Sequence, residues 1–190
     1  MADGTINSEE MISASSFQRL IDIGIALSAE RDTNVLMETI LLEAKSLSNA
    51  DGGTLYIRTP DNRLKFEIMR TDSLNIAMGG TTGKDINFPP LNLFDLETGE
   101  ENHKNVASAA ALTGNSINIP DAYENESFDF SGTKKFDEGT GYRSKSFLCV
   151  PLNNSQNQVI GVLQLLNAVD ADTGEVIEFR PDIQPLIEAL

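Results

Sequence analysis

Two strand-like segments near the end of the chain constrain its fold more than any other feature. Residues 146–152 and 158–167 have the composition of strands, and the polar residues 153–157 between them are typical of a hairpin turn. Each segment is apolar on both faces. In the first, the two faces carry Leu148 and Val150 against Phe147 and Cys149. Strands with two apolar faces are covered on both sides, so we expect this antiparallel hairpin at the centre of a sheet.

Helical patterns stand at both ends of the chain. Apolar residues at helical spacing predict a first helix over residues 15–28 and a second over about residues 34–47. Asp32 or Thr33 is the expected N-cap of the second helix. A last helical pattern starts near Pro181 and is still running at the final residue, so we expect more helix to follow in the natural protein.

Shorter patterns fill the middle of the chain. The expected elements are strands at 54–58, 64–69 and 117–119, a turn at 59–62, and a short helix at 106–112. Residues 71–104 form a long polar passage, and residues 121–138 are expected to be loop with one helical turn. Loops of this length inside a compact domain are usually functional.

These elements together predict an α+β sandwich. Its centre is a five- to six-stranded, mainly antiparallel sheet, with the terminal helices on one face. The long loop and the short helix roof a pocket on the other face. With 190 residues the chain fits one domain, which we place at residues 15–190 after a flexible segment, residues 1–14.

Charge and composition exclude several classes of partner. The formal net charge is −15, which disfavours nucleic acid and anionic lipid surfaces. Residues 1–16 lack the basic and apolar segments of a signal peptide, and no apolar run is long enough to cross a bilayer. We therefore expect a cytoplasmic protein with no membrane partner.

Motifs that would indicate catalysis fail on inspection. Residues 79–85 look like a phosphate-binding loop, but the glycine spacing is wrong and Asp85 stands where a hydroxyl residue is required. His103 is the only histidine and Cys149 the only cysteine, too few for a zinc site. Cys149 lies mid-strand among apolar residues, as inert core thiols do. We expect no catalytic residues, no metal and no cofactor.

Four ordered segments in the second half of the chain resemble the GAF domain family. They are residues 118–123 (NIPDAY), 140–144 (TGYRS), 147–152 (FLCVPL) and 159–167 (VIGVLQLLN), with a weaker match upstream at 50–57 (ADGGTLYI). The likeness is greatest to the GAF domains of cyclic-nucleotide phosphodiesterases and bacterial adenylyl cyclases. Residues 128–133 (FDFSGT) are similar to a bacterial subgroup that precedes phosphohydrolase (HD-GYP-like) or nucleotide cyclase domains.

The resemblance implies a set of ligand-contacting positions. In cyclic-nucleotide-binding members these positions look like Thr54, Met69, Val106, Asp137, Thr140, Ser144 and Gln164 here. The residues themselves allow a second interpretation. Thr140 and Ser144 could organise a turn, Asp137 could cap backbone amides, and Gln164, a polar residue on an apolar strand face, could pair with a neighbour.

One part of the nucleotide-binding pattern is missing. Members of that subfamily carry an Asn-Lys pair after the last strand and a Phe-x-x-x-Asp-Glu sequence beyond it. Here the pair is Asn167-Ala168, and Phe179 is followed by Arg180-Pro181-Asp182-Ile183. The lysine, the final acid and the spacing are absent, which counts against a cyclic nucleotide as the ligand.

The resemblance implies a sensory module of a larger signalling protein. Its pocket would bind a small molecule, with cyclic GMP and cyclic AMP as candidates, and the terminal helices would pass the change to an output domain. Ile23 and Ile25 fall outside the main apolar face of the first helix, so we expect a homodimer through the terminal helices.

Two alternatives remain open at this stage. One is a dimerisation scaffold whose pocket is filled by side chains. The other is an enzyme like the GAF-fold free methionine sulfoxide reductases, which use several cysteines where this chain has one. An open cavity beneath residues 71–104 would separate the sensor from the scaffold.

Overall fold

The computed structural model describes residues 8–190, with side-chain surroundings from residue 18 onward. The helices are α1 (Ser8–Ala29), α2 (Thr33–Ser48), α3 (Val106–Thr113), α4 (Ser131–Thr140) and α5 (Gln184–Glu188), with a short 3₁₀ turn η1 (Gly80–Thr82). The strands are β1 (Ala50–Arg58), β2 (Arg63–Thr71), β3 (Ile76–Gly79), β4 (Leu91–Asn92), β5 (Ile117–Ile119), β6 (Phe147–Asn153), β7 (Val159–Val169) and β8 (Val176–Ile177).

One antiparallel sheet joins all of these strands. Six follow the order β3-β2-β1-β7-β6-β5, while the two-residue strands β4 and β8 pair with β2 and β7. β6 and β7 form the predicted hairpin, with Val150 opposite Leu163. Both strands lie inside the sheet with a partner on each side. The prediction from their two apolar faces is confirmed.

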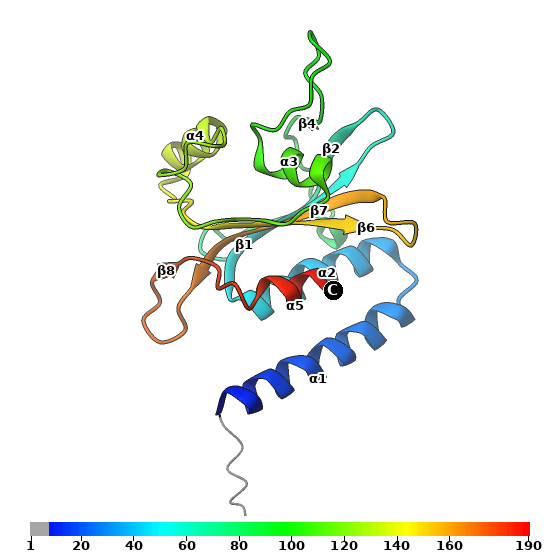
Figure 1. Ribbon diagram of the computed structural model, residues 1–190, viewed down its shortest axis with the longest axis vertical. Helices are drawn as coiled ribbons and strands as arrows, with labels where there is room; N and C mark the ends of the chain where they lie inside the picture. Colours follow the sequence, from blue (N-terminus) through cyan, green and yellow to red (C-terminus); the bar gives the residue numbers. More distant parts are fainter. Residues whose placement is uncertain (1–7) are drawn as a thin grey trace, which may run out of the picture.

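The sheet separates two apolar layers (Figure 1). On one face, α2 and α5 cover the strands, and α1 lies against α2. The core of this face includes Leu41, Leu55, Ile68, Leu148, Leu163, Leu165, Phe179 and Ile187. On the other face, α3, α4 and the loops form a roof over Tyr56, Leu64, Phe147, Cys149 and Val162. The α+β sandwich predicted from the sequence is confirmed.

Local capping explains where α2 starts and stops. The Asp32 side chain accepts hydrogen bonds from the backbone N–H groups of Asn34 (2.9 Å) and Val35 (3.4 Å). At the other end, Asn49 takes a left-handed conformation (φ 51°), which ends the helix and leads directly into β1. Asp32 is thus the N-cap, one of the two residues expected in that role.

Helix α1 differs from the expectation in two ways. It begins at Ser8, seven residues before the expected start at residue 15, while residues 1–7 lie outside the described part of the chain. Ile23 is 7% exposed, because it lies one turn after Arg19, whose guanidinium bonds Glu43 and Ser46 of α2. Ile25, at 65% exposure, does face outward.

The middle of the chain holds more regular structure than predicted. β1 begins at Ala50, four residues before the expected strand, and so includes Gly52 and Gly53. The passage 71–104 contains β3, η1 and β4, and the segment predicted as loop at 121–138 contains most of α4. The sequence of α4 has one glycine and one threonine near each end, Gly132-Thr133 and Gly139-Thr140. Because glycine is a weak helix former, these residues weaken the helical pattern in the sequence.

A buried ion pair fixes the position of α2 on the sheet. The guanidinium of Arg70, on β2, bonds the carboxylate of Glu38, and their side chains are only 8% and 14% exposed. The same carboxylate accepts hydrogen bonds from the backbone N–H (2.9 Å) and hydroxyl of Thr81 in η1. The loop that resembles a phosphate-binding motif therefore binds a carboxylate of its own chain.

No helix within residues 8–190 combines the length and the apolar character that a bilayer crossing requires.

Replacing Glu38 by Gln should destabilise the fold by about 3 kcal/mol at neutral pH, because Arg70 would stay buried without its counter-charge. Burial opposes ionisation of Glu38, but the bonds from Thr81 and Arg70 outweigh it and lower its pKa. A lowered pKa stabilises the fold above the unfolded-state value of about 4.3 and loses that effect as the pH falls. Urea denaturation should show the deficit shrinking below about pH 4. Glu178→Gln, an exposed site, is the control.

Candidate functional site

Cross-strand rows form the floor of the site. In an antiparallel sheet, directly opposed residues share a face. Thr54 on β1 is opposite Met69 on β2 and Gln164 on β7, and Gln164 is in turn opposite Cys149 on β6. These four side chains therefore form one line across the middle of the sheet, on the face under the roof. The register alone brings together residues from four strands.

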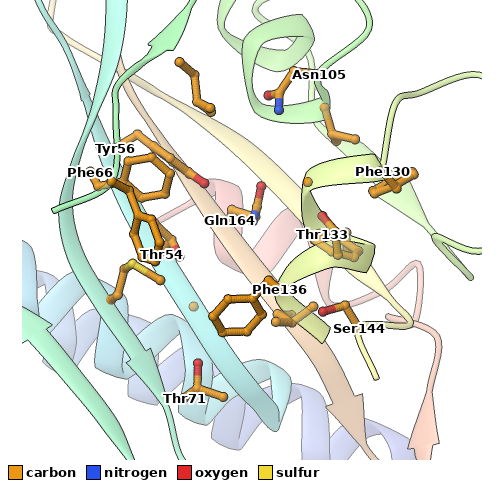
Figure 2. A pocket seen from close by; sticks show the side chains of 18 of the residues that line it. Thr54, Tyr56, Phe66, Thr71, Asn105, Phe130, Thr133, Phe136, Ser144 and Gln164 are labelled. Atoms are coloured by element: carbon orange, nitrogen blue, oxygen red, sulfur yellow. The ribbon is translucent and has the colours of Figure 1, made fainter. Parts of the chain in front are cut away.

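A cavity of about 330 Å³ lies between this floor and the roof, and Figure 2 shows side chains from the sheet and from α4 converging on it. Its volume falls at the low end of the range typical of small-ligand pockets. Residues of β1, β2, β6, β7, α3, α4 and the loop before β4 line it. They are Gly53, Thr54, Tyr56, Phe66, Met69, Thr71, Phe88, Pro89, Leu91, Asn105, Val106, Asp129, Phe130, Gly132, Thr133, Phe136, Ser144, Phe147, Gln164 and Leu166.

Aromatic rings stand on opposite sides of the cavity. On the β1–β2 side, the ring centroid of Phe66 lies 4.7 Å from that of Tyr56 and 5.5 Å from that of Phe88. On the roof side, the centroid of Phe130 lies 5.3 Å from that of Phe147 at the sheet. Two aromatic walls with a polar floor between them form a slot, a shape that suits a flat ring.

Two hydroxyl groups on the floor face the cavity without a protein partner. Thr54 is 8% exposed and Tyr56 is buried, and in the described part of the chain neither hydroxyl has a hydrogen-bond partner. Burial raises the pKa of Tyr56, which therefore stays a neutral phenol. Among the described residues, neither hydroxyl oxygen is a fully buried unpaired atom, so both are accessible from the cavity and mark positions where a bound molecule can be hydrogen-bonded.

The cavity lining carries little charge. Among the described residues that line it, none is a lysine, arginine or histidine, and Asp129 is the one carboxylate. The Asp129 carboxylate accepts a hydrogen bond from the backbone N–H of Ser131 at the start of α4 (2.8 Å). That bond, with the hydroxyl of the same serine, lowers the pKa of Asp129. The interior of the slot offers neutral hydrogen-bonding groups.

The structure brings five of the seven predicted site residues together. Thr54, Met69, Val106, Ser144 and Gln164 all line the cavity. Asp137 and Thr140 are not among the lining residues. Thr140 is exposed at the end of α4, and its hydroxyl donates to the carbonyl of Phe136 (2.9 Å). Asp137 is 3% exposed and points toward Ser144 and Tyr123.

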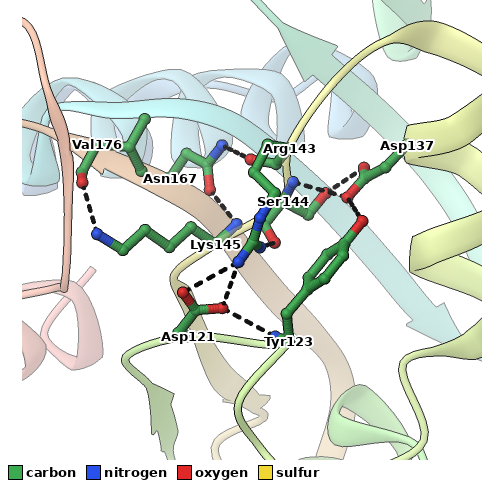
Figure 3. Close-up of polar contacts among 8 residues, drawn as sticks. All are labelled: Asp121, Tyr123, Asp137, Arg143, Ser144, Lys145, Asn167 and Val176. Atoms are coloured by element: carbon green, nitrogen blue, oxygen red, sulfur yellow. Dashed lines mark hydrogen bonds and ion pairs between the residues drawn. The ribbon is translucent and has the colours of Figure 1, made fainter.

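Asp137 ties α4 to the loop before β6 and to Tyr123 (Figure 3). Its carboxylate accepts hydrogen bonds from the backbone N–H of Ser144 (2.8 Å), from the Ser144 hydroxyl (2.8 Å) and from the Tyr123 hydroxyl (3.0 Å). Gly141 ends α4 in the left-handed conformation (φ 70°) that lets the chain turn back to Ser144. Of the two interpretations of Asp137, this geometry matches amide capping.

A second polar cluster shapes the loop before β6. Arg143 lies 3.6 Å from the ring centroid of Tyr123 and bonds the carboxylate of Asp121 (3.0 Å). Burial works against ionisation of Asp121, but the backbone N–H of Tyr123 and the Arg143 guanidinium prevail and lower its pKa. Asn167, in a left-handed conformation, accepts from Lys145 N (2.7 Å) and donates to Arg143 O (2.8 Å). Asn167, which corresponds to the asparagine of the Asn-Lys pair, therefore hydrogen-bonds to backbone groups of its own chain.

The other candidate residues lie apart from the cavity or inside the core. His103 is exposed on the loop before α3, and its Nε2 lies 2.7 Å from a carboxylate oxygen of Glu101. Cys149 is buried, and burial raises the pKa of its thiol. In the part of the chain that the structure describes, no group of three His, Cys, Asp or Glu side chains converges as a metal site would.

The sequence interpretation missed the aromatic walls. Phe66 alternates along a recognisable strand, so its face could have been assigned. Phe136 lies on α4 and Phe130 directly before it, in a segment expected to be loop with one helical turn, and Phe88 lies in the irregular passage before β4. For those three, the sequence carried no periodic signal that would place them at one cavity.

Replacing Asp137 by Asn should remove charge-assisted hydrogen bonds and destabilise the protein by about 2 kcal/mol, since hydrogen bonds to charged groups contribute about 1.5–3 kcal/mol each and the amide retains part of them. Chemical denaturation gives the free energy of unfolding. Glu138→Gln, the exposed neighbour on the same helix, is the matched control and should change it by less than about 0.5 kcal/mol. Equal stability of the two variants would contradict the role assigned to Asp137.

Comparisons with known proteins agree with this architecture. The GAF domain family matches residues 32–190. The cGMP-specific 3′,5′-cyclic phosphodiesterase of Drosophila mojavensis is 31% identical over 161 residues, covering 80% of this chain and 13% of that protein. The dual 3′,5′-cyclic-AMP and -GMP phosphodiesterase 11 of Drosophila melanogaster is 28% identical, covering 75% of this chain and 9% of that protein. The chain thus matches a small part of these relatives.

Among solved structures, the GAF domain of a phosphoenolpyruvate-protein phosphotransferase from Coxiella burnetii shares the fold. Its TM-score is 0.61 at 13% sequence identity, over 90% of this chain and 84% of that one. The family match begins at Asp32, the N-cap of α2, so α1 precedes it. GAF domains are regulatory ligand-binding modules of signalling proteins. On its sequence and its fold, this chain belongs to the GAF domain family.

Proposed function

We propose that this chain is the sensory domain of a larger signalling protein and binds a small flat-ring molecule in the cavity under α3 and α4. The observation that supports this most directly is the open cavity, with the hydroxyls of Thr54 and Tyr56 facing it unpaired. Hydrogen bonds between a ligand and these two hydroxyls are a source of binding free energy. In a scaffold with a filled pocket, side chains would occupy the cavity and cover these hydroxyls. The sensor is therefore the better supported alternative.

Cyclic nucleotides are the first compounds to test. The relatives that this chain resembles are named as phosphodiesterases of cyclic GMP or of both cyclic nucleotides. A purine ring suits the slot between Phe66 and Phe130, with Thr54 and Gln164 below it. The phosphate would find no cationic side chain in the described lining, and the amides at the start of α3 are the nearest match for an anion.

The wider setting follows from the family. As a regulatory module, the chain itself carries no catalytic role in this proposal, and the output lies in another part of the parent protein. A phosphohydrolase of the HD-GYP kind or a nucleotide cyclase is the proposed output domain, and the cytoplasm is the proposed location. Ligand binding biases the terminal helices only by its differential affinity for their arrangements.

Calorimetric titration with cyclic GMP and cyclic AMP tests the site. Replacing Thr54 by Val keeps the side-chain shape but removes one hydrogen bond, which should weaken binding by about 2- to 12-fold, equivalent to about 0.5–1.5 kcal/mol. Thr140→Ala, outside the cavity, is the matched control and should bind as the wild type does. Binding that is weakened by Thr140→Ala but not by Thr54→Val would refute the placement of the site.

We also propose that the domain forms a homodimer through its terminal helices. Ile21 and Ile25 are exposed one turn apart on α1, and Leu42 is exposed on α2. Apolar side chains at this spacing form a stripe of the kind that helix pairing buries. Because Ile23 is covered within the protomer, the stripe is built from Ile21 and Ile25.

Replacing Ile25 by Lys should therefore shift the protein toward monomer in sedimentation equilibrium, since a charge would enter the apolar contact. Ile160→Lys, at an exposed isoleucine on β7, is the control and should leave the mass unchanged. A wild-type protein that stays monomeric at high micromolar concentration would exclude the dimer.

A further inference from the structure

Gln164 lies on the floor of the cavity, and its side-chain amide contacts Cys149 on the neighbouring strand β6. The thiol Sγ of Cys149 lies 3.5 Å from Oε1 of Gln164 and is placed to donate to it. Because the two residues are directly opposed on β6 and β7, the contact follows from the strand register. On its other side, Gln164 is opposite Thr54, whose hydroxyl faces the cavity.

The thiol determines which end of the Gln164 amide faces Cys149. Cys149 is fully buried, and its raised pKa keeps it protonated at neutral pH. An S–H group is a weak donor, and a carbonyl oxygen is a much better acceptor than sulfur. Turning the amide over would place its NH₂ group against the sulfur and leave the carbonyl without this donor. Oε1 therefore faces Cys149, and the two N–H donors of Gln164 are left for the cavity.

We infer that Cys149 is a positioning residue, which holds the Gln164 amide with its NH₂ group toward the cavity so that the floor selects ligands presenting a hydrogen-bond acceptor. The inference rests on the ligand site proposed above. The preferred ligand class is a flat ring with a carbonyl on the edge that meets β7. A ring with an amino group there would place donor against donor and leave buried groups unpaired.

The first test needs no ligand. Because the chain has a single cysteine, its S–H stretching band in the Raman spectrum belongs to Cys149 alone. Replacing Gln164 by Met removes the acceptor at similar size and should shift that band to higher frequency, toward a thiol with no acceptor. Thr54→Val, on the far side of Gln164, is the control and should leave the band in place. An unchanged band in Gln164→Met would overturn the contact.

The second test measures selectivity with two matched probes, the 3′,5′-cyclic monophosphates of inosine and adenosine. They differ on one ring edge, where inosine has a carbonyl and adenosine an amino group. The wild-type protein should bind the inosine compound about fivefold more tightly, the equivalent of one neutral hydrogen bond. Gln164→Glu, which offers an acceptor in place of the donors, should reverse the preference.

The role of the thiol is separated by two variants of similar size. Cys149→Val removes the donor, so the Gln164 amide can turn over. The ratio of the affinities for the inosine and adenosine compounds should then fall toward one. Cys149→Ser keeps a donor and should retain most of the preference. Thermal unfolding of each variant shows whether the core is intact. A merely structural role of Cys149 would lower the affinities for both probes equally and leave their ratio unchanged.

The outcomes distinguish this inference from the function on which it rests. Equal affinities in the wild type, or a full preference in Cys149→Val, overturn the inference and leave the ligand site standing. If neither probe binds at millimolar concentration, the purine site is wrong, and the carbonyl selectivity fails with it.

Discussion

The structure depends on the burial of three neighbouring strands, β1, β7 and β6, on both faces. Because they are apolar on both sides, they require a layer above and a layer below, which the helices α2 and α5 and the roof provide. The antiparallel register then decides which side chains meet. It places Thr54, Gln164 and Cys149 in one line, and no loop has to be positioned for that line to exist. The floor of the site is therefore built by the same strands as the core.

The roof is held differently. At one end of α4, Phe130 contacts Phe147 of the sheet, and at the other the buried carboxylate of Asp137 bonds Ser144 in the loop before β6. Such a carboxylate is stable in the interior only while its hydrogen bonds persist. The polar residues that the family resemblance assigned to the ligand are thus divided between two tasks. Thr54 and Gln164 face the cavity, while Asp137 and the hydroxyl of Ser144 maintain its cover.

The sequence predicted those parts of the fold that repeat. The β6–β7 hairpin, α2 with its Asp32 cap, and the short helix α3 could be predicted from residue patterns and capping residues. The helix α4 could not, because its glycines weaken the pattern and its stability comes from tertiary contacts. Ile23 shows the same limit on α1. The side of α1 that is buried depends on its contact with α2, where Arg19 pairs with Glu43. The spacing of apolar residues along α1 alone does not contain that information.

The sheet is one peptide layer thick, and β7 shows what this means for the domain. Gln164 lies on the cavity face, while its neighbours Leu163 and Leu165 are packed in the core beneath α2 and α5. Side chains alternate across the backbone, so the two environments are separated by one residue. A molecule that draws the backbone of Gln164 upward must draw both leucines with it, away from the helices. The cavity floor and the core beneath the helices are thus two sides of the same strand.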